Sequence, residues 1–169
     1  STHELKAVAD AIRGQGPADR RIANAMATFA ARALAGRALA YALLAEPVDP
    51  LVDTERLAAR RRYTALYAEA VATGLAEGDL APQPPELAAA AMVGVVSEAL
   101  VGPLARARIV DPGHGVLTEA DVMIIAEIVG FCRRGLCRQA QRRLPRRVVQ
   151  DADRAPRAAV GLVVLPNRG

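Results

Sequence analysis

Apolar residues recur every three or four positions along most of this chain, which is the period of an amphipathic α-helix. Short stretches rich in Gly and Pro interrupt the pattern. The segments that carry it are residues 2–14, 17–35, 37–46, 51–77, 85–105 and 118–139. We therefore predict an all-α fold, an antiparallel helical bundle of about six helices.

A corner is encoded in the stretch ALLAEPVDPLVDTER, residues 42–56. Pro47 and Pro50 have no backbone N–H to donate, and each disfavours helical geometry in the residue before it. The stretch predicts a hinge between a short helix and a long helix that begins at Leu51. The long helix is expected to stop at Gly78, because glycine readily adopts the left-handed conformation that closes helices.

The last two expected helices are the most apolar. Residues 85–105 are apolar on nearly every side until Pro103, and a helix of that kind must be covered on every side. In residues 118–139, Thr118 is a favourable N-cap and Asp121 completes a capping box. Both helices need more apolar partners than a small monomer supplies, which favours self-association.

The end of the chain differs from the rest in composition. Residues 133–169 hold ten arginines against two aspartates, while the preceding residues hold twelve basic and sixteen acidic side chains. The net charge of +4 therefore comes from the tail. We predict a helical domain over residues 1–140 and an irregular extension, rich in Arg and Pro, over residues 141–169.

Membrane insertion and secretion are not expected. The most apolar run, Leu87 to Val96, is about half of the ~20 residues that span a bilayer, and no signal peptide is visible. Cys132 and Cys137 are five positions apart on an expected helix, so their side chains point to different sides and should not form a disulfide. Free thiols fit a reducing compartment, so we predict a cytoplasmic protein with no membrane partner.

Residues suited to catalysis or metal binding are scarce. His3 and His114 are far apart in sequence, and neither has a cysteine or a paired carboxylate at ligand spacing. No Gly-rich phosphate loop follows a strand, and no nucleophile motif occurs. The sequence therefore predicts a protein that is not an enzyme, with no catalytic residues, no metal and no cofactor.

Three side chains remain as candidates for binding. Tyr63 and Tyr67 are four positions apart on one helix face, where they either line a cavity or pack in the core with their hydroxyls at the surface. Glu98 interrupts the most apolar helix, and a carboxylate buried there needs a partner or a raised pKa. It binds a polar ligand group, pairs with an arginine or across a subunit interface, acts as a base, or lies at an exposed edge.

Residues 37–104 resemble the C-terminal regulatory domain of TetR-family transcriptional repressors. The stretches that carry the resemblance are LAYALLAEPVDP, GLAEGDL, ELAAAAMVG and SEALVGPL. With the flanking helices, the resemblance covers residues 1–140. It implies an all-helical, ligand-binding homodimer that takes part in transcription regulation.

In that family, a helix-turn-helix domain that binds DNA precedes the regulatory domain. Residues 2–14 fall where the family's connecting helix would lie, and no segment of this chain has the helix-turn-helix pattern. The resemblance therefore implies that DNA is a partner only through a helix-turn-helix domain that this chain does not contain.

The resemblance also assigns two sets of residues. The family's last two helices form a four-helix interface with those of the second subunit, and here they are residues 85–105 and 118–139. The expected interface residues are Ala91, Gly94, Val95, Ile124, Ile128 and Phe131. The family's ligand cavity lies among the middle helices, and matching helix by helix gives Met26, Phe29, Tyr63, Tyr67, Met92, Val96 and, as a polar anchor, Glu98. These side chains imply a hydrophobic or amphipathic small-molecule effector.

The leading hypothesis is thus an effector-binding and dimerisation domain, in which the ligand shifts the helices and residues 2–14 transmit the change. A second hypothesis is a stand-alone dimeric helical interaction module without a ligand, which a sealed core would favour. A third is a small enzyme that uses Glu98 with Tyr63 or Tyr67. It requires these side chains to meet in one cleft.

Overall fold

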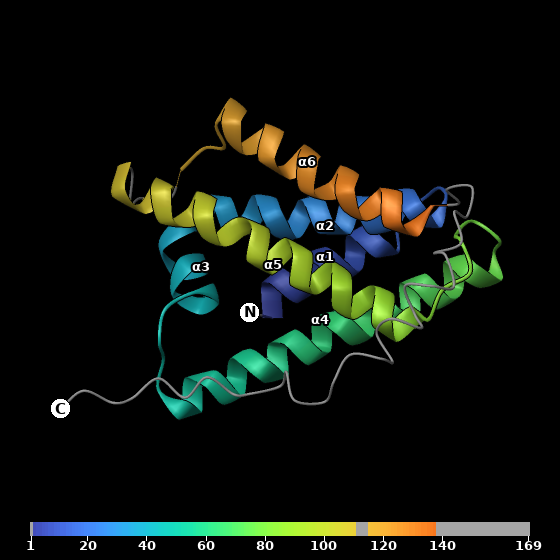
Figure 1. Ribbon diagram of the computed structural model, residues 1–169, viewed down its shortest axis with the longest axis horizontal. Helices are drawn as coiled ribbons and strands as arrows, with labels where there is room; N and C mark the ends of the chain where they lie inside the picture. Colours follow the sequence, from blue (N-terminus) through green and yellow to red (C-terminus); the bar gives the residue numbers. More distant parts are fainter. Residues whose placement is uncertain (1, 111–114, 138–169) are drawn as a thin grey trace, which may run out of the picture. The chain divides into compact units, whose positions relative to one another are not determined.

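The computed structural model describes residues 2–110 and 115–137, and over those ranges it is all-α, as the periodicity predicts (Figure 1). Six helices follow one another there: α1 (Thr2–Ile12), α2 (Ala18–Ala35), α3 (Arg37–Leu44), α4 (Pro50–Ala76), α5 (Pro85–Val110) and α6 (Glu119–Leu136). They belong to one unit, Ser1–Gln139. The predicted extension, residues 141–169, lies outside the described residues.

Helix α2 is central to the packing, in contact with α1, α4 and α6, while the second half of α4 packs against the first part of α5 (Figure 1). Ile22, Met26 and Leu34 of α2 are fully buried at helical spacing, together with Leu100 and Leu104 of α5. Burying side chains of this size contributes about 1.5–3 kcal/mol each. The rest of the core is rich in alanine and valine, so the helices approach one another closely.

The predicted corner between α3 and α4 is confirmed. Asp49 is the N-cap of α4, where its Oδ1 accepts a hydrogen bond from the N–H of Leu51 at 2.9 Å, and Pro50 is the first helical residue. After the end of α4, Gly78 has a φ of +78°, the left-handed conformation that glycine adopts readily. These local signals place both ends of the longest helix.

Helix α5 is longer than the sequence predicts. The predicted helix covers residues 85–105, but α5 passes through Pro103 and continues to Val110. A proline inside a helix removes the hydrogen bond to the carbonyl four residues earlier. That carbonyl belongs to Ala99, which is exposed, so water can satisfy it.

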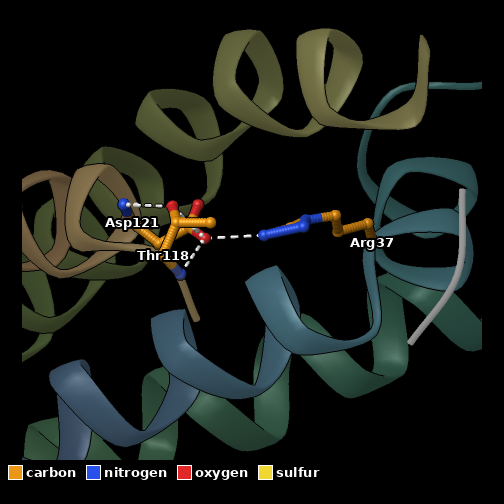
Figure 2. A network of polar contacts seen from close by, with 3 residues as sticks. All are labelled: Arg37, Thr118 and Asp121. Carbon is orange, nitrogen blue, oxygen red and sulfur yellow. Dashed lines mark hydrogen bonds and ion pairs between the residues drawn. The ribbon is translucent and has the colours of Figure 1, made fainter. Parts of the chain in front are cut away.

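A buried ion pair between α3 and α6 holds the start of α6 in place (Figure 2). The Arg37 guanidinium donates through Nη2 to Oδ2 of Asp121 at 2.6 Å, and the two side chains are 5% and 9% exposed. The same oxygen accepts hydrogen bonds from the N–H and the Oγ1 of Thr118, each at 2.8 Å. Together with the bond from the Asp121 N–H to Thr118 Oγ1, they complete the predicted capping box.

These contacts also set the charge of Asp121. Burial alone would raise the pKa of its carboxyl, but the hydrogen bonds from Thr118 and Arg37 outweigh burial and hold that pKa below its usual value. Asp121 is therefore ionised at neutral pH and pairs with a guanidinium that is always charged.

The other end of α6 is attached as well. Arg133 forms an ion pair with Asp19 of α2 at 2.7 Å. The carbonyl of Leu136 accepts a hydrogen bond from the N–H of Ala81 at 3.0 Å. Because both ends of α6 are attached to other elements, the side of α6 that faces away from the bundle is also fixed.

Helices α2 and α4 approach closely at Gly74, which is buried. A Cβ atom at this position would lie 2.5 Å from Cβ of Ala18 and 2.8 Å from Cδ1 of Leu80. Separations this short do not occur between packed carbon atoms, so a side chain here would push the start of α2 away from α4.

We expect Gly74→Ala to lower the free energy of unfolding by about 1–3 kcal/mol through overpacking, although alanine itself favours a helix. Gly135→Ala is the matched control, because Gly135 lies in α6 with open space around it. The control should be neutral or stabilising by up to about 1 kcal/mol. Chemical denaturation measures both, and equal effects would refute the close approach.

Candidate functional site

One face of the α5 and α6 pair is apolar and exposed to solvent. Leu87 of α5 and Met123 and Phe131 of α6 are 67%, 64% and 59% exposed. Ala91 and Gly94 continue the face along α5 at helical spacing from Leu87. We call these five residues the α5–α6 face. The sequence led us to expect α5 to be covered on every side, but the described chain leaves this side open, and soluble proteins seldom leave such a face uncovered.

A shallow groove of about 630 Å³ lies between the two helices within this face. Its lining residues are Gly94, Val95, Glu98, Ala99, Glu127, Ile128 and Phe131. The lining is apolar except for the two carboxylates, Glu98 and Glu127, which are both exposed. Glu127 lies one turn from both Met123 and Phe131 on α6, and Glu98 lies one turn after Gly94 on α5, so the two carboxylates interrupt the apolar surface.

All six residues predicted for a dimer interface lie on α5 and α6. Four of them line the groove, namely Gly94, Val95, Ile128 and Phe131. Ala91 is exposed and precedes the groove on α5, while Ile124 is half-buried one turn before Ile128. The dimer itself stays a prediction, and the residues assigned to it lie on or beside one apolar face.

The six apolar and aromatic residues predicted to line a ligand cavity belong to one packed cluster. Four are buried, namely Met26, Tyr67, Met92 and Val96, and the half-buried Phe29 and Tyr63 pack against that core. The rings of Phe29 and Tyr63 meet edge to face, with centroids 5.2 Å apart and an interplanar angle of 75°. None of the six lines the groove above or the cleft described below.

Burial sets the protonation of the two tyrosines. It raises the pKa of the Tyr67 hydroxyl far above its ordinary value, and it raises that of Tyr63, where the Glu4 carboxylate adds to the effect. Both hydroxyls are therefore protonated at neutral pH. Glu98 is exposed at the α5–α6 groove, which neither tyrosine lines. The three side chains of the enzyme hypothesis do not meet in that groove.

The cysteines and acidic residues offer no reactive or metal-binding cluster among the described residues. Cys132 and Cys137 are free thiols, as predicted. Burial raises the pKa of Cys132 to about 11, so its thiol stays protonated and unreactive at neutral pH. Within the described ranges, no three His, Cys, Asp or Glu side chains are grouped to hold a metal ion.

A second cleft, which the sequence did not reveal, lies where α1, α2 and α4 meet, and we call it the α1–α2–α4 cleft. Its volume is about 200 Å³. Its lining residues are Ala9, Ile12, Arg13, Ala18, Arg21, Ile22, Leu66, Glu69, Ala70 and Thr73. The small and branched residues on these helices predict that the helices pack together. They do not predict that the packing leaves a cleft between them.

Helix α5 is also long and apolar enough to cross a membrane, judged only by the length and composition of its residues Pro85–Arg106. The run Leu87 to Val96, which is too short to span a bilayer, is a part of this longer stretch. One such helix in the described chain is weak support for a membrane span, because the core helix of a soluble bundle passes the same test. Helix α5 also contacts α4 and contributes several core residues, among them Met92, Val96 and Leu100.

Comparison of the chain with models of protein families, with curated proteins and with solved structures finds no match. The class of the protein therefore rests on its helices and their surfaces. In the described residues these define an all-α unit with an exposed apolar face at one helix pair and a small cleft among three other helices.

Proposed function

We propose that this chain is the effector-binding and dimerisation domain of a TetR-like transcriptional repressor. It senses a hydrophobic or amphipathic small molecule and couples binding to the release of DNA. The observation that carries the proposal is the exposed apolar α5–α6 face, which lies on the two helices that the resemblance assigns to dimerisation. A second copy of the same face would cover it, as in the two-fold interfaces of most homodimers.

The proposed mechanism is a shift between two arrangements of the helices. An effector that binds one arrangement better than the other changes their populations, and the coupling is reciprocal. Helix α1 is the element suited to transmit the change, because it packs along α2 and touches α4. The DNA-binding heads would belong to a helix-turn-helix domain outside this chain.

A thermal-shift screen combined with native mass spectrometry tests this function. We expect a dimer mass, and at least one hydrophobic or amphipathic compound that raises the melting temperature. A ligand at 100 times its Kd stabilises the native state by about 2.7 kcal/mol, which is readily measured. A monomer that no compound stabilises would contradict the proposal.

The packed cluster around Tyr67 favours a second candidate function, a stand-alone dimeric interaction module without a ligand. Met26 and Met92 are both less than one-twentieth exposed in that cluster. The same screen separates the two functions. A dimer that no compound stabilises would favour the interaction module, whereas a stabilised dimer would favour the regulator.

A further inference from the structure

The α1–α2–α4 cleft combines an apolar lining with charged side chains. Ile12, Ile22 and Leu66 line it together with alanines from the same three helices. The volume of about 200 Å³ exceeds the ~150 Å³ of an engineered cavity that holds benzene. The cleft therefore has room for a single ring or a six-carbon chain with a polar head.

Arg21 of α2 brings to this cleft a buried hydrogen-bond donor that lacks an acceptor. Its Nη2 donates to Oε2 of Glu77, but its Nε is buried and has no hydrogen-bond partner among the described residues. A buried N–H without an acceptor is unfavourable, because it has given up water and gained no hydrogen bond in exchange. A ligand oxygen beside Arg21 would supply the missing acceptor.

The charged side chains that line the cleft are more positive than negative. Arg13 and Arg21 are present with a single carboxylate, that of Glu69, which is exposed. Arg13 lies 3.4 Å from Asp10, and the two side chains are 72% and 58% exposed. An exposed ion pair of this kind is weak, so the Arg13 guanidinium can also attract a second anion.

We propose that this cleft binds an amphipathic organic carboxylate. The apolar part of the ligand lies against Ile12, Ile22 and Leu66. The Arg21 side chain, which is 20% exposed, turns so that its Nε–H donates to a carboxylate oxygen, and Arg13 supplies a second positive charge. As the effector class of the proposed regulator this inference rests on that function, but the binding itself does not.

A cationic ligand of the same size fits the cleft less well. An ammonium group has three donors and no acceptor, so it cannot accept a hydrogen bond from the Nε–H of Arg21. It would also bring a third positive charge beside two guanidinium groups. A neutral hydroxyl can accept the hydrogen bond, but that bond is weaker than one to a carboxylate. The donor and the charges therefore select the anion.

The test uses three probes that share an apolar part but differ in charge: hexanoate, hexanol and hexylamine. Isothermal titration calorimetry on the full chain at neutral pH and low salt should give a Kd of about 0.1–1 mM for hexanoate, a range typical of ligands this small. Hexanol and hexylamine should bind at least about tenfold more weakly, since neither offers a charged acceptor. Hexylamine that binds as tightly as hexanoate, or hexanoate that does not bind, would overturn the proposal.

Two arginine variants locate the site. Arg21→Met should weaken hexanoate binding about tenfold and leave hexanol unchanged, because it removes the donor but keeps an apolar side chain. Arg62→Met, at an exposed position of α4 outside the lining, should change neither affinity. Unchanged hexanoate affinity in Arg21→Met would overturn the proposal.

A third variant, Glu77→Gln, separates ligand binding from the ion pair that Arg21 already makes. Both Arg21→Met and Glu77→Gln remove this pair, but only Glu77→Gln keeps the guanidinium and frees it for the ligand. We expect it to tighten hexanoate binding about threefold, the scale of an exposed pair. A weaker affinity would mean that the ion pair shapes the cleft, and would overturn the proposed contact.

Sedimentation of the same samples keeps this inference apart from the proposed function. A dimer without hexanoate binding defeats only this inference. A monomer that binds hexanoate defeats only the proposed function.

Discussion

Replacing Phe131 by aspartate is expected to abolish the dimer that we propose for this chain. Phe131 is 59% exposed in the single chain and lines the groove of the α5–α6 face. Burial of a phenylalanine side chain contributes about 1.5–3 kcal/mol, and a two-fold interface loses that contribution twice. The new carboxylate would also lie near Glu98 and Glu127. We therefore expect the dimer dissociation constant to rise about 10²- to 10⁴-fold.

Sedimentation velocity over a concentration series measures this change. Leu51→Asp is the matched control, because Leu51 is 80% exposed and lies on α4, outside the α5–α6 face. Both variants should keep the helical circular dichroism of the original chain, since both positions are largely exposed. A Phe131→Asp protein that sediments like the control would remove the α5–α6 face from the interface.

Replacing Arg37 by methionine is expected to destabilise the fold by about 3–5 kcal/mol, the usual cost of removing one partner of a buried ion pair. The change leaves the Asp121 carboxylate buried beside α3 without its guanidinium. Arg32→Met is the matched control, because the pair of Arg32 with Glu4 is 44% and 42% exposed. An exposed pair contributes about 0–1 kcal/mol. Urea denaturation of the two variants compares the costs.

The same ion pair predicts a dependence of stability on pH. The pKa of Asp121 is lowered in the folded state, so the pair contributes its full stability above the unfolded pKa of about 3.9. That contribution is lost as the pH falls through the folded pKa. We expect the unmodified chain to lose stability more steeply than Arg37→Met on acidification below about pH 4. Parallel acid profiles would contradict this account of the pair.

Sequence reasoning succeeded where a structural feature depends on neighbouring residues. Pro50, Gly78 and Thr118 mark helix ends through their own backbone or side-chain chemistry, and the structure confirms all three. The same local logic placed the end of α5 at residue 105, whereas the helix continues to Val110, and its tolerance of Pro103 depends on whether the Ala99 carbonyl reaches solvent. Exposure of that kind is a property of the packed bundle.

Features made by distant residues could not be predicted from local patterns. Arg37 and Asp121 are 84 positions apart, and the sequence marks Arg37 only as one arginine among many. Matching by helix alone assigns both Tyr63 and Glu98 to the ligand site, but their surroundings differ. Tyr63 packs against Phe29, while Glu98 is exposed at the α5–α6 groove. Which side of a helix is covered, and whether a contact leaves a cleft, follows from three-dimensional packing.

The central claim is that the α5–α6 face joins two copies of this chain. Sedimentation equilibrium of the unmodified chain over a wide range of concentrations tests it most directly. We predict a single species with twice the mass of the chain, which dissociates only at the lowest concentrations. A species with the mass of one chain at every concentration would contradict the account.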